Sequence, residues 1–320
     1  STRMNKAKNF GNYEFYYVDI ADYSTIHGVM EKFKPEIVIH VAAQPSAPYA
    51  GMDVHHCNYT QQNNTQMLRN IMWALHNLGL NDTHLIVTTT TGIYGAPDFE
   101  IPEGNIVINK DELPFPSMGG SWYHMSRAHD SANLWLASKQ FKFPITELRT
   151  AIVCGSSTEE TSMGREFRNR FDVDSYFGVV VHRFDAQAMS TKPLYVYGKG
   201  LQRKPMISLE DMVASTVSCC NLQKQKKYEV FNQTDKPIAI VEIAERIKKY
   251  CGEKLNIPVH IDHISNPRIE DEEHQMVMHN EKFVERLCGG QIKQSVDKAI
   301  DIMCSDLQSF TAGLAELVRR

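Results

Sequence analysis

The sequence lacks a long apolar run and an excess of basic residues. No apolar stretch approaches the ~18 residues that a membrane-spanning helix needs, and the best run, residues 37–43, has the length of a strand. The 34 basic and 38 acidic residues give a net charge of −4, and no basic stripe marks a nucleic-acid-binding face. We therefore expect no membrane span and no nucleic-acid partner.

Paired cysteines are also missing. The seven cysteines are scattered, and no two of them form a Cys-x-x-Cys motif. This distribution argues against a disulfide framework and against a zinc site. His55 and His56 are adjacent but have no third ligand at metal spacing. We predict no metal and a reducing compartment, such as the cytoplasm or an organelle matrix or stroma.

Strand-like and helix-like segments alternate in the first half of the chain. Predicted strands cover residues 14–20, 37–43, 85–90 and 144–153, and predicted helices cover residues 23–33, 58–78 and about 123–139. Such alternation is typical of right-handed βαβ units around a mostly parallel sheet. The predicted fold is α/β, with a Rossmann-like doubly wound sheet.

The pattern changes after residue 153. A charged segment at 158–173 precedes helices at 178–189, 241–250 (closed by Gly252) and beyond 296, with short strands at 193–197, 228–232 and 258–261. Ser208 is positioned to cap a further helix, with Asp211 three residues later. We predict two domains, a Rossmann-like domain at 1–153 and a smaller α+β domain at 154–320.

Tyr123 and Arg127 share a face of the predicted helix, because positions i and i+4 lie one above the other. A nearby cation favours the phenolate, so Tyr123, whose free pKa is ~10, could act as a general base. Thr90 ends a predicted strand, where functional groups collect in such sheets. A Thr–Tyr–cation trio suits hydride chemistry on an alcohol. The alternative is that Thr88 to Thr91 are only β-branched strand residues.

Several short strings in one order carry a family resemblance. They are Gln44-x-Ser46-Ala47-Pro48-Tyr49, Tyr59-Thr60-Gln61-x-Asn63-Asn64, Thr90-x-Gly92-x-Tyr94-Gly95, Tyr123-His124-x-Ser126, Tyr197-Gly198-Lys199-Gly200-x-Gln202 and Asn266-Pro267-Arg268-x-Glu270. With them the sequence resembles the extended short-chain dehydrogenase/reductase superfamily and, more closely, the UDP-sulfoquinovose synthase family. The resemblance runs from about Glu14 to the C-terminal helices.

The resemblance implies an NAD-dependent enzyme that oxidises UDP-glucose at C4 and adds sulfite at C6. Residues 1–153 would bind the dinucleotide and residues 154–320 the nucleotide-sugar. The implied catalytic residues are Thr90, Tyr123 and Arg127. The implied contacts with NAD are Asp19, Ile20, Ala42, Asn63, Tyr123 and Arg127. The implied contacts with the UDP-sugar are Gln44, Thr90, His182, Arg183, Gln202 and Arg268. The chain would work as a homo-oligomer or as a subunit of a larger complex.

The sequence departs from the family pattern within the site. The glycine-rich turn is missing, as are two strands that would lie between residues 14–20 and 37–43, so we expect a preceding segment, a second polypeptide or a rearranged fold to supply them. Arg127 replaces a Lys and keeps the charge but not the geometry. The other departures are Ile93 for Glu, Pro45 for Arg and Lys204 for Arg. Two alternatives follow: a catalytically degenerate structural subunit, or ligand binding without turnover.

Overall fold

The main sheet of the protein has four parallel strands. The computed structural model describes residues 11–95, 97, 99–104, 106–108, 111–113, 119–164, 167, 171–222, 227–266 and 274–308. The strands are β1 (Ile37–His40), β2 (His84–Thr88), β5 (Ile145–Thr150) and β9 (Tyr228–Gln233), in the order β1-β2-β5-β9. The predicted α/β fold with a Rossmann-like sheet is confirmed.

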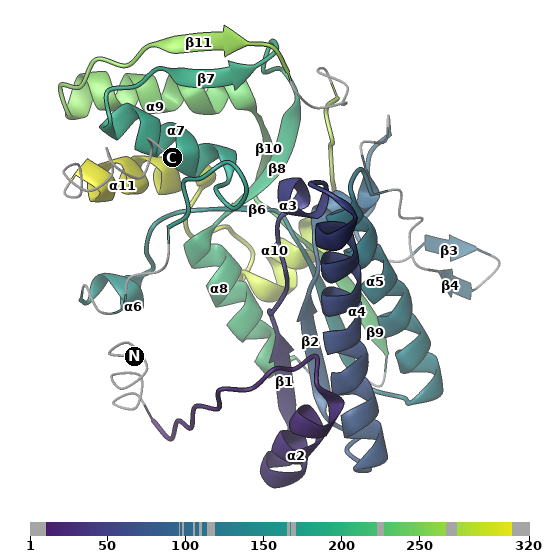
Figure 1. Ribbon diagram of the computed structural model, residues 1–320. Coiled ribbons are helices and arrows are strands. Elements are labelled where there is room, and N and C mark those ends of the chain that lie inside the picture. The colour runs from purple at the N-terminus through teal and green to yellow at the C-terminus, as the bar shows by residue number, and fades with distance from the viewer. Residues whose placement is uncertain are drawn as a thin grey trace.

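Helices cover both faces of this sheet (Figure 1). On one face lie α2 (Tyr23–Phe33), α4 (Val54–Asn77) and α5 (Trp122–Gln140), and on the other lie α8 (Leu209–Ser218) and α10 (Glu281–Leu287). The two faces bury separate apolar clusters, one around Leu85 and Val87 and one around Ile86 and Phe231. Neighbouring residues of β2 thus point to opposite faces, as the two-residue repeat of a strand requires.

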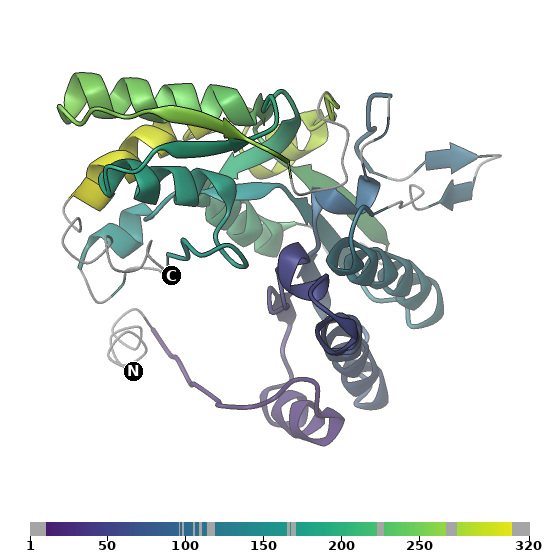
Figure 2. The same ribbon diagram turned by 45° about the horizontal axis from the view of Figure 1, so that its top comes forward.

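The remaining elements form a second layered unit, which Figure 2 shows from above. A three-stranded sheet has the order β10 (Lys236–Ala239), β8 (Arg203–Ser208), β6 (Ile152–Cys154), and β7 (Leu194–Tyr197) pairs with β11 (Ile261–Ile264). Helices α7 (Val180–Met189), α9 (Ile240–Lys254) and α11 (Val296–Gln308) share its core. The short elements are α3 (Ala47–Ala50), η2 (Thr91–Tyr94), β3 (Ile106–Ile108), β4 (Asp111–Leu113), α6 (Glu159–Ser162) and η4 (Cys219–Asn221).

Several predicted elements need correction. Strands β8 and β10 were not predicted, α9 continues past Gly252 to Lys254, and β11 begins at Ile261. The Ser208 cap of α8 is confirmed, because its side chain accepts the Asp211 amide at 3.0 Å. Strand β9 lies beyond residue 153 yet pairs with β5, so the domain division at that residue stays a prediction.

The predicted strand at residues 14–20 is wrong. This segment has no ladder partner within the described part of the chain, and Tyr17 is 97% exposed. A strand needs a neighbour to satisfy its backbone groups, and the sequence alone does not show whether one is present. Instead, the end of the segment is held by α4, where Asn70 Nδ2 donates to the Ala21 carbonyl at 2.8 Å.

Strand β1 is paired on one side only. Within the described residues it pairs with β2, and its other edge has no strand against it. Ile39 is 42% exposed and the following Val41 is 58% exposed, although the inner strands of a doubly wound sheet are covered on both faces. The predicted vacancy beside residues 37–41 is therefore present in the described sheet.

A carboxyl group lies inside the core of the second unit. Asp185 of α7 is fully buried, and its surroundings include the α11 residue Cys304. Burial raises the pKa of the Asp185 carboxyl to about 7, and Asp306 adds to the rise, while the nearby Cys304 thiol opposes it. The core of this unit therefore binds a proton more tightly than an unfolded chain does.

This proton makes stability depend on pH. An unfolded Asp has a pKa of ~3.9, so between that value and the folded value of about 7 the folded chain binds more protons, and the free energy of unfolding falls as pH rises. We expect Asp185→Asn to reduce this fall, measured by urea denaturation at about pH 4 and about pH 8. The control is Asp262→Asn at an exposed position of β11. Equal pH dependence in Asp185→Asn and the native chain would contradict this account.

Candidate active site

Two capped turns place the candidate catalytic side chains at the carboxyl end of β2. Ser121 Oγ accepts the His124 amide at 3.1 Å and starts α5. Thr90 Oγ1 accepts the Gly92 amide at 3.1 Å and starts η2. The helix and the turn lie in contact at this end of the sheet (Figure 1). The caps therefore fix the backbone on either side of the site.

The Thr90 side chain lies near the phenol of Tyr123 and acts to lower its pKa. The predicted approach of these two groups is thus present in the structure. The predicted lowering of the Tyr123 pKa is wrong, however. Burial raises the pKa of Tyr123 and Asp130 adds to the rise, while Arg127 and the Thr90 side chain oppose it. Desolvation outweighs a nearby cation here, because it disfavours the charged phenolate.

Arg127 is turned into the protein rather than left open to solvent. Its side chain is only 2% exposed, and Nη1 donates to Asp130 Oδ2 at 2.7 Å. Nη2 donates to the carbonyl of Thr88, the last residue of β2. The guanidinium fork, which suits two acceptors at once, therefore ties α5 to the end of β2.

A buried polar cluster lies beneath this site. Glu147 Oε1 and Arg149 Nε, both on β5, lie 3.3 Å apart with no exposed surface on either side chain. Glu147 also accepts hydrogen bonds from Thr89, Ser131 and Tyr228. These bonds and Arg149 hold the pKa of Glu147 below its usual value against the effect of burial, which is the largest single influence and acts in the opposite direction.

Arg149 extends the cluster towards the loop that follows β2. Its Nη1 donates to the Tyr94 hydroxyl at 2.7 Å, and this hydroxyl donates to Asn232 Oδ1, also at 2.7 Å. The sequence analysis did not identify the cluster. The available signal was two opposite charges, Glu147 and Arg149, on one face of an otherwise apolar strand.

His124 lies under the η2 turn, next to Tyr123. A Cβ atom placed on Gly92 would lie 2.3 Å from the His124 ring, so only glycine leaves room for it. Burial, with a smaller effect from Lys204, lowers the pKa of His124 to about 4, so the ring is neutral near pH 7. Lys204 Nζ lies 3.0 Å from His274 Nε2, which must accept because an ammonium only donates.

Asn64, the neighbour of the predicted NAD contact Asn63, supports the Tyr123 helix. Its Nδ2 donates to Ser126 Oγ on α5 at 3.0 Å, and its Oδ1 accepts the Gln44 amide at 2.7 Å. Asn64 is fully buried, whereas Asn63 is only partly buried. Asn64 has the right position because it lies one turn from Thr60 and Leu68 on the inner face of α4.

The other predicted contacts are spread around the site, and their roles stay predictions. Asp19 is exposed and caps the Ala21 amide at 2.9 Å, while Ile20 is partly buried. His182 stacks on Phe171 with ring centres 4.2 Å apart, and burial lowers the pKa of His182 to about 4. The Arg183 guanidinium carbon lies 5.9 Å from the centre of the Tyr197 ring. Gln202 is 3% exposed. Arg268 lies outside the described residues.

The loop after β1 leaves polar atoms available to a cofactor. Among the described residues, His40 Nε2 and Gln44 Nε2 are buried without a hydrogen-bond partner. Ala42 lies between them in sequence and is exposed. A dinucleotide binds at the carboxyl ends of such strands, so these residues, with Tyr123 and Thr90, fit its nicotinamide end. Arg127 bonds Asp130 and Thr88, and its Nε is also buried without a hydrogen-bond partner.

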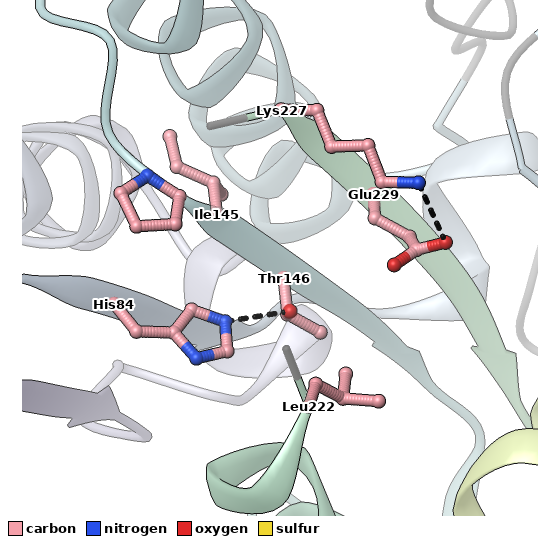
Figure 3. Close-up of a pocket in the computed structure, with 7 residues that line it drawn as sticks. His84, Ile145, Thr146, Leu222, Lys227 and Glu229 are labelled. Atoms are coloured by element: carbon pink, nitrogen blue, oxygen red, sulfur yellow. Dashed lines mark hydrogen bonds and ion pairs between the residues drawn. The ribbon is translucent and has the colours of Figure 1, made fainter. Parts of the chain in front are cut away.

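A small pocket lies at the opposite end of the sheet. His84, Ile145, Thr146, Leu222, Lys227 and Glu229 line it (Figure 3). His84 Nε2 is 2.8 Å from Thr146 Oγ1, and Lys227 Nζ is 3.6 Å from Glu229 Oε1. This is the amino-terminal end of the strands, so the pocket is separate from the candidate site.

Comparisons with known proteins agree with this geometry. The family described as NAD dependent epimerase/dehydratase matches residues 1–232. UDP-sulfoquinovose synthase from the chloroplast of Spinacia oleracea is 36% identical over 272 residues, which are 83% of this chain and 56% of that protein. The chain therefore spans little more than half of that relative. UDP-sulfoquinovose synthase from Sulfolobus acidocaldarius is 35% identical over 307 residues, which are 94% of this chain and 77% of that protein.

Solved structures show the same fold at low identity. UDP-glucose 4-epimerase from Thermotoga maritima, solved with UDP-glucose, has a TM-score of 0.73 at 18% identity, over 93% of this chain and 85% of that one. UDP-glucuronic acid 4-epimerase from Bacillus cereus, solved with UDP-glucuronic acid and NAD, has a TM-score of 0.72 at 19% identity, over 95% and 85%.

The close contact beneath η2 gives a stability prediction. A methyl group in Gly92→Ala would meet the His124 ring, which must then move. We expect the free energy of unfolding to fall by ~1–3 kcal/mol, measured by urea denaturation. The control is Gly28→Ala in α2, where nothing lies within 4 Å of the added methyl and the better helix former should be neutral or stabilising. A Gly92→Ala variant as stable as the native chain would refute the contact.

Proposed function

The chain belongs to the NAD dependent epimerase/dehydratase family, and from this premise we propose that it is an NAD-dependent nucleotide-sugar enzyme of the UDP-sulfoquinovose synthase type. The observation that carries the proposal is that the Tyr123 phenol and the Thr90 side chain lie near each other at the carboxyl end of β2. The identity of 35% to the Sulfolobus acidocaldarius synthase over most of both chains supports it.

The reaction begins with oxidation of a sugar hydroxyl at C4. NAD, when bound, supplies the hydride acceptor. Tyr123 takes the hydroxyl proton on its phenol oxygen, and Thr90 holds that hydroxyl in position. Because burial raises the pKa of Tyr123, the phenol is protonated near neutral pH. The phenol must therefore lose its own proton before it can accept the proton of the sugar hydroxyl.

The substrate would lie between the two layered units. Gln44 and Thr90 lie in the segments that follow β1 and β2 of the main sheet, and His182, Arg183 and Gln202 come from the second unit. Arg183 supplies a positive charge that suits a diphosphate. We assign UDP-glucose as the sugar nucleotide, with the synthase relatives as support. After oxidation at C4, water would leave across C5–C6, sulfite would add at C6, and the hydride would return to C4.

Turnover provides the direct test. We expect the purified chain, incubated with UDP-glucose, NAD and sulfite, to form UDP-sulfoquinovose, detected by mass spectrometry. Tyr123→Phe removes the proton acceptor and should lower kcat by ~10²–10⁴-fold. Tyr17→Phe, at a side chain that is 97% exposed, is the control and should keep the native rate. No turnover together with no bound NAD would contradict the proposal.

A second candidate function is that of a catalytically degenerate structural subunit in a larger complex. Two observations favour it. Arg127 is bonded to Asp130 and Thr88, and the outer edge of β1 has no partner strand within the described residues. That edge can accept strands from another segment or another chain. Binding of a dinucleotide or sugar nucleotide without turnover is an intermediate case.

Assembly state separates the two candidates. A structural subunit should be recovered in a larger assembly, and Ile39→Lys should release it, because a charge on an edge strand opposes strand addition. Native mass spectrometry measures the assembly, and Tyr195→Lys, at an exposed β7 position, is the control. A chain that runs alone as a monomer or homodimer with NAD bound would count against the structural role.

A further inference from the structure

We infer that Asp130 is a positioning residue that sets the proton affinity of Tyr123 by neutralising Arg127; the catalytic meaning of this role rests on the proposed function. All three side chains project from α5. Tyr123 and Arg127 are four residues apart and Arg127 and Asp130 three, so they follow one another along the helix. The three residues therefore lie along one face of α5, with Arg127 between Tyr123 and Asp130.

The ion pair is enclosed by protein. Arg127 Nη1 and Asp130 Oδ2 are 2.7 Å apart, and the two side chains are 2% and 0% exposed. The Thr88 carbonyl accepts the second amino group. Without water between them, buried charges act more strongly on each other and on their neighbours than surface charges do. The net charge of the Arg127–Asp130 pair therefore determines the electrostatic potential at the Tyr123 phenol.

The two charges act on Tyr123 in opposite directions. Arg127 lowers the pKa of Tyr123, whereas Asp130 raises it, and burial raises it most. With Asp130 ionised, the pair is neutral and gives the phenolate little help. With Asp130 protonated, Arg127 acts alone and favours the phenolate. The state of Asp130 therefore changes how easily the phenol loses its proton.

The Asp130 carboxyl gains or loses its proton near neutral pH. Burial raises the pKa of Asp130 to about 7 and Glu147 of β5 adds to the rise, while Arg127 and Arg69 of α4 oppose it. His40 of β1 also faces Arg127, but burial lowers the pKa of His40 to about 4, so it is neutral in this range. Ionisation of Asp130 thus makes ionisation of Tyr123 harder, and the two groups titrate as a coupled pair.

The test measures the phenol directly and needs no turnover. The Tyr123 ring carbon bonded to oxygen is followed by ¹³C NMR in tyrosine-labelled protein, with Tyr123→Phe for assignment. Asp130→Asn keeps an acceptor for Arg127 and removes the charge, so we expect the Tyr123 pKa to fall by roughly 1–3 units. Asp185→Asn, at a buried carboxyl in the other core, should leave it unchanged.

A double variant tests whether Asp130 acts on Tyr123 through Arg127. It also provides a control in case the single variant does not fold. Arg127→Met with Asp130→Asn removes both charges, which costs less stability than leaving one buried charge alone. Its phenol should titrate close to the native value. The inference is overturned if Asp130→Asn titrates like the native protein, or if the double variant departs from it by as much as the single variant. A shifted phenol in a chain without turnover keeps the inference and removes only the proposed activity.

Discussion

The candidate site depends on the buried ion pair between Arg127 and Asp130. It fixes the first turns of α5 against the end of β2, and so fixes the distance between the phenol of Tyr123 and the hydroxyl of Thr90. Removing one partner of a buried pair leaves an uncompensated charge and is strongly destabilising. The same contact therefore supports the fold at this point and determines the electrostatic environment of the only phenol assigned to catalysis.

The convergence of Tyr123 and Thr90 could be predicted from the sequence because it follows from two local rules, helical spacing and the position of strand ends. The pKa of Tyr123 could not, because desolvation depends on what packs around the phenol and outweighs Arg127. The prediction of a strand at residues 14–20 failed for a related reason, because its outcome also depended on what surrounds the segment. Its aromatic and β-branched residues are typical of a strand, but pairing depends on a neighbour that a local pattern does not show.

The polar cluster around Glu147 and Arg149 shows a different limit. Charged residues in a predicted inner strand suggested nothing about partners, and these partners come from β2, η2, α5 and β9, up to 81 positions away in the chain. Such long-range contacts are invisible to periodicity. Once formed, they hold β5 against its neighbours beneath the site, so the scaffold can keep its shape while residues at the site itself differ from the family pattern.

The open edge of β1 has a consequence for handling the protein. An uncovered strand offers a row of unpaired backbone groups that other copies can join, which is a common start of aggregation. Two features limit the hazard: the strand has only four residues, and Pro35 and Pro45 flank it. Solubility of the isolated chain should therefore depend on its concentration, and a segment or partner that paired with this edge of β1 would also protect the chain against self-association.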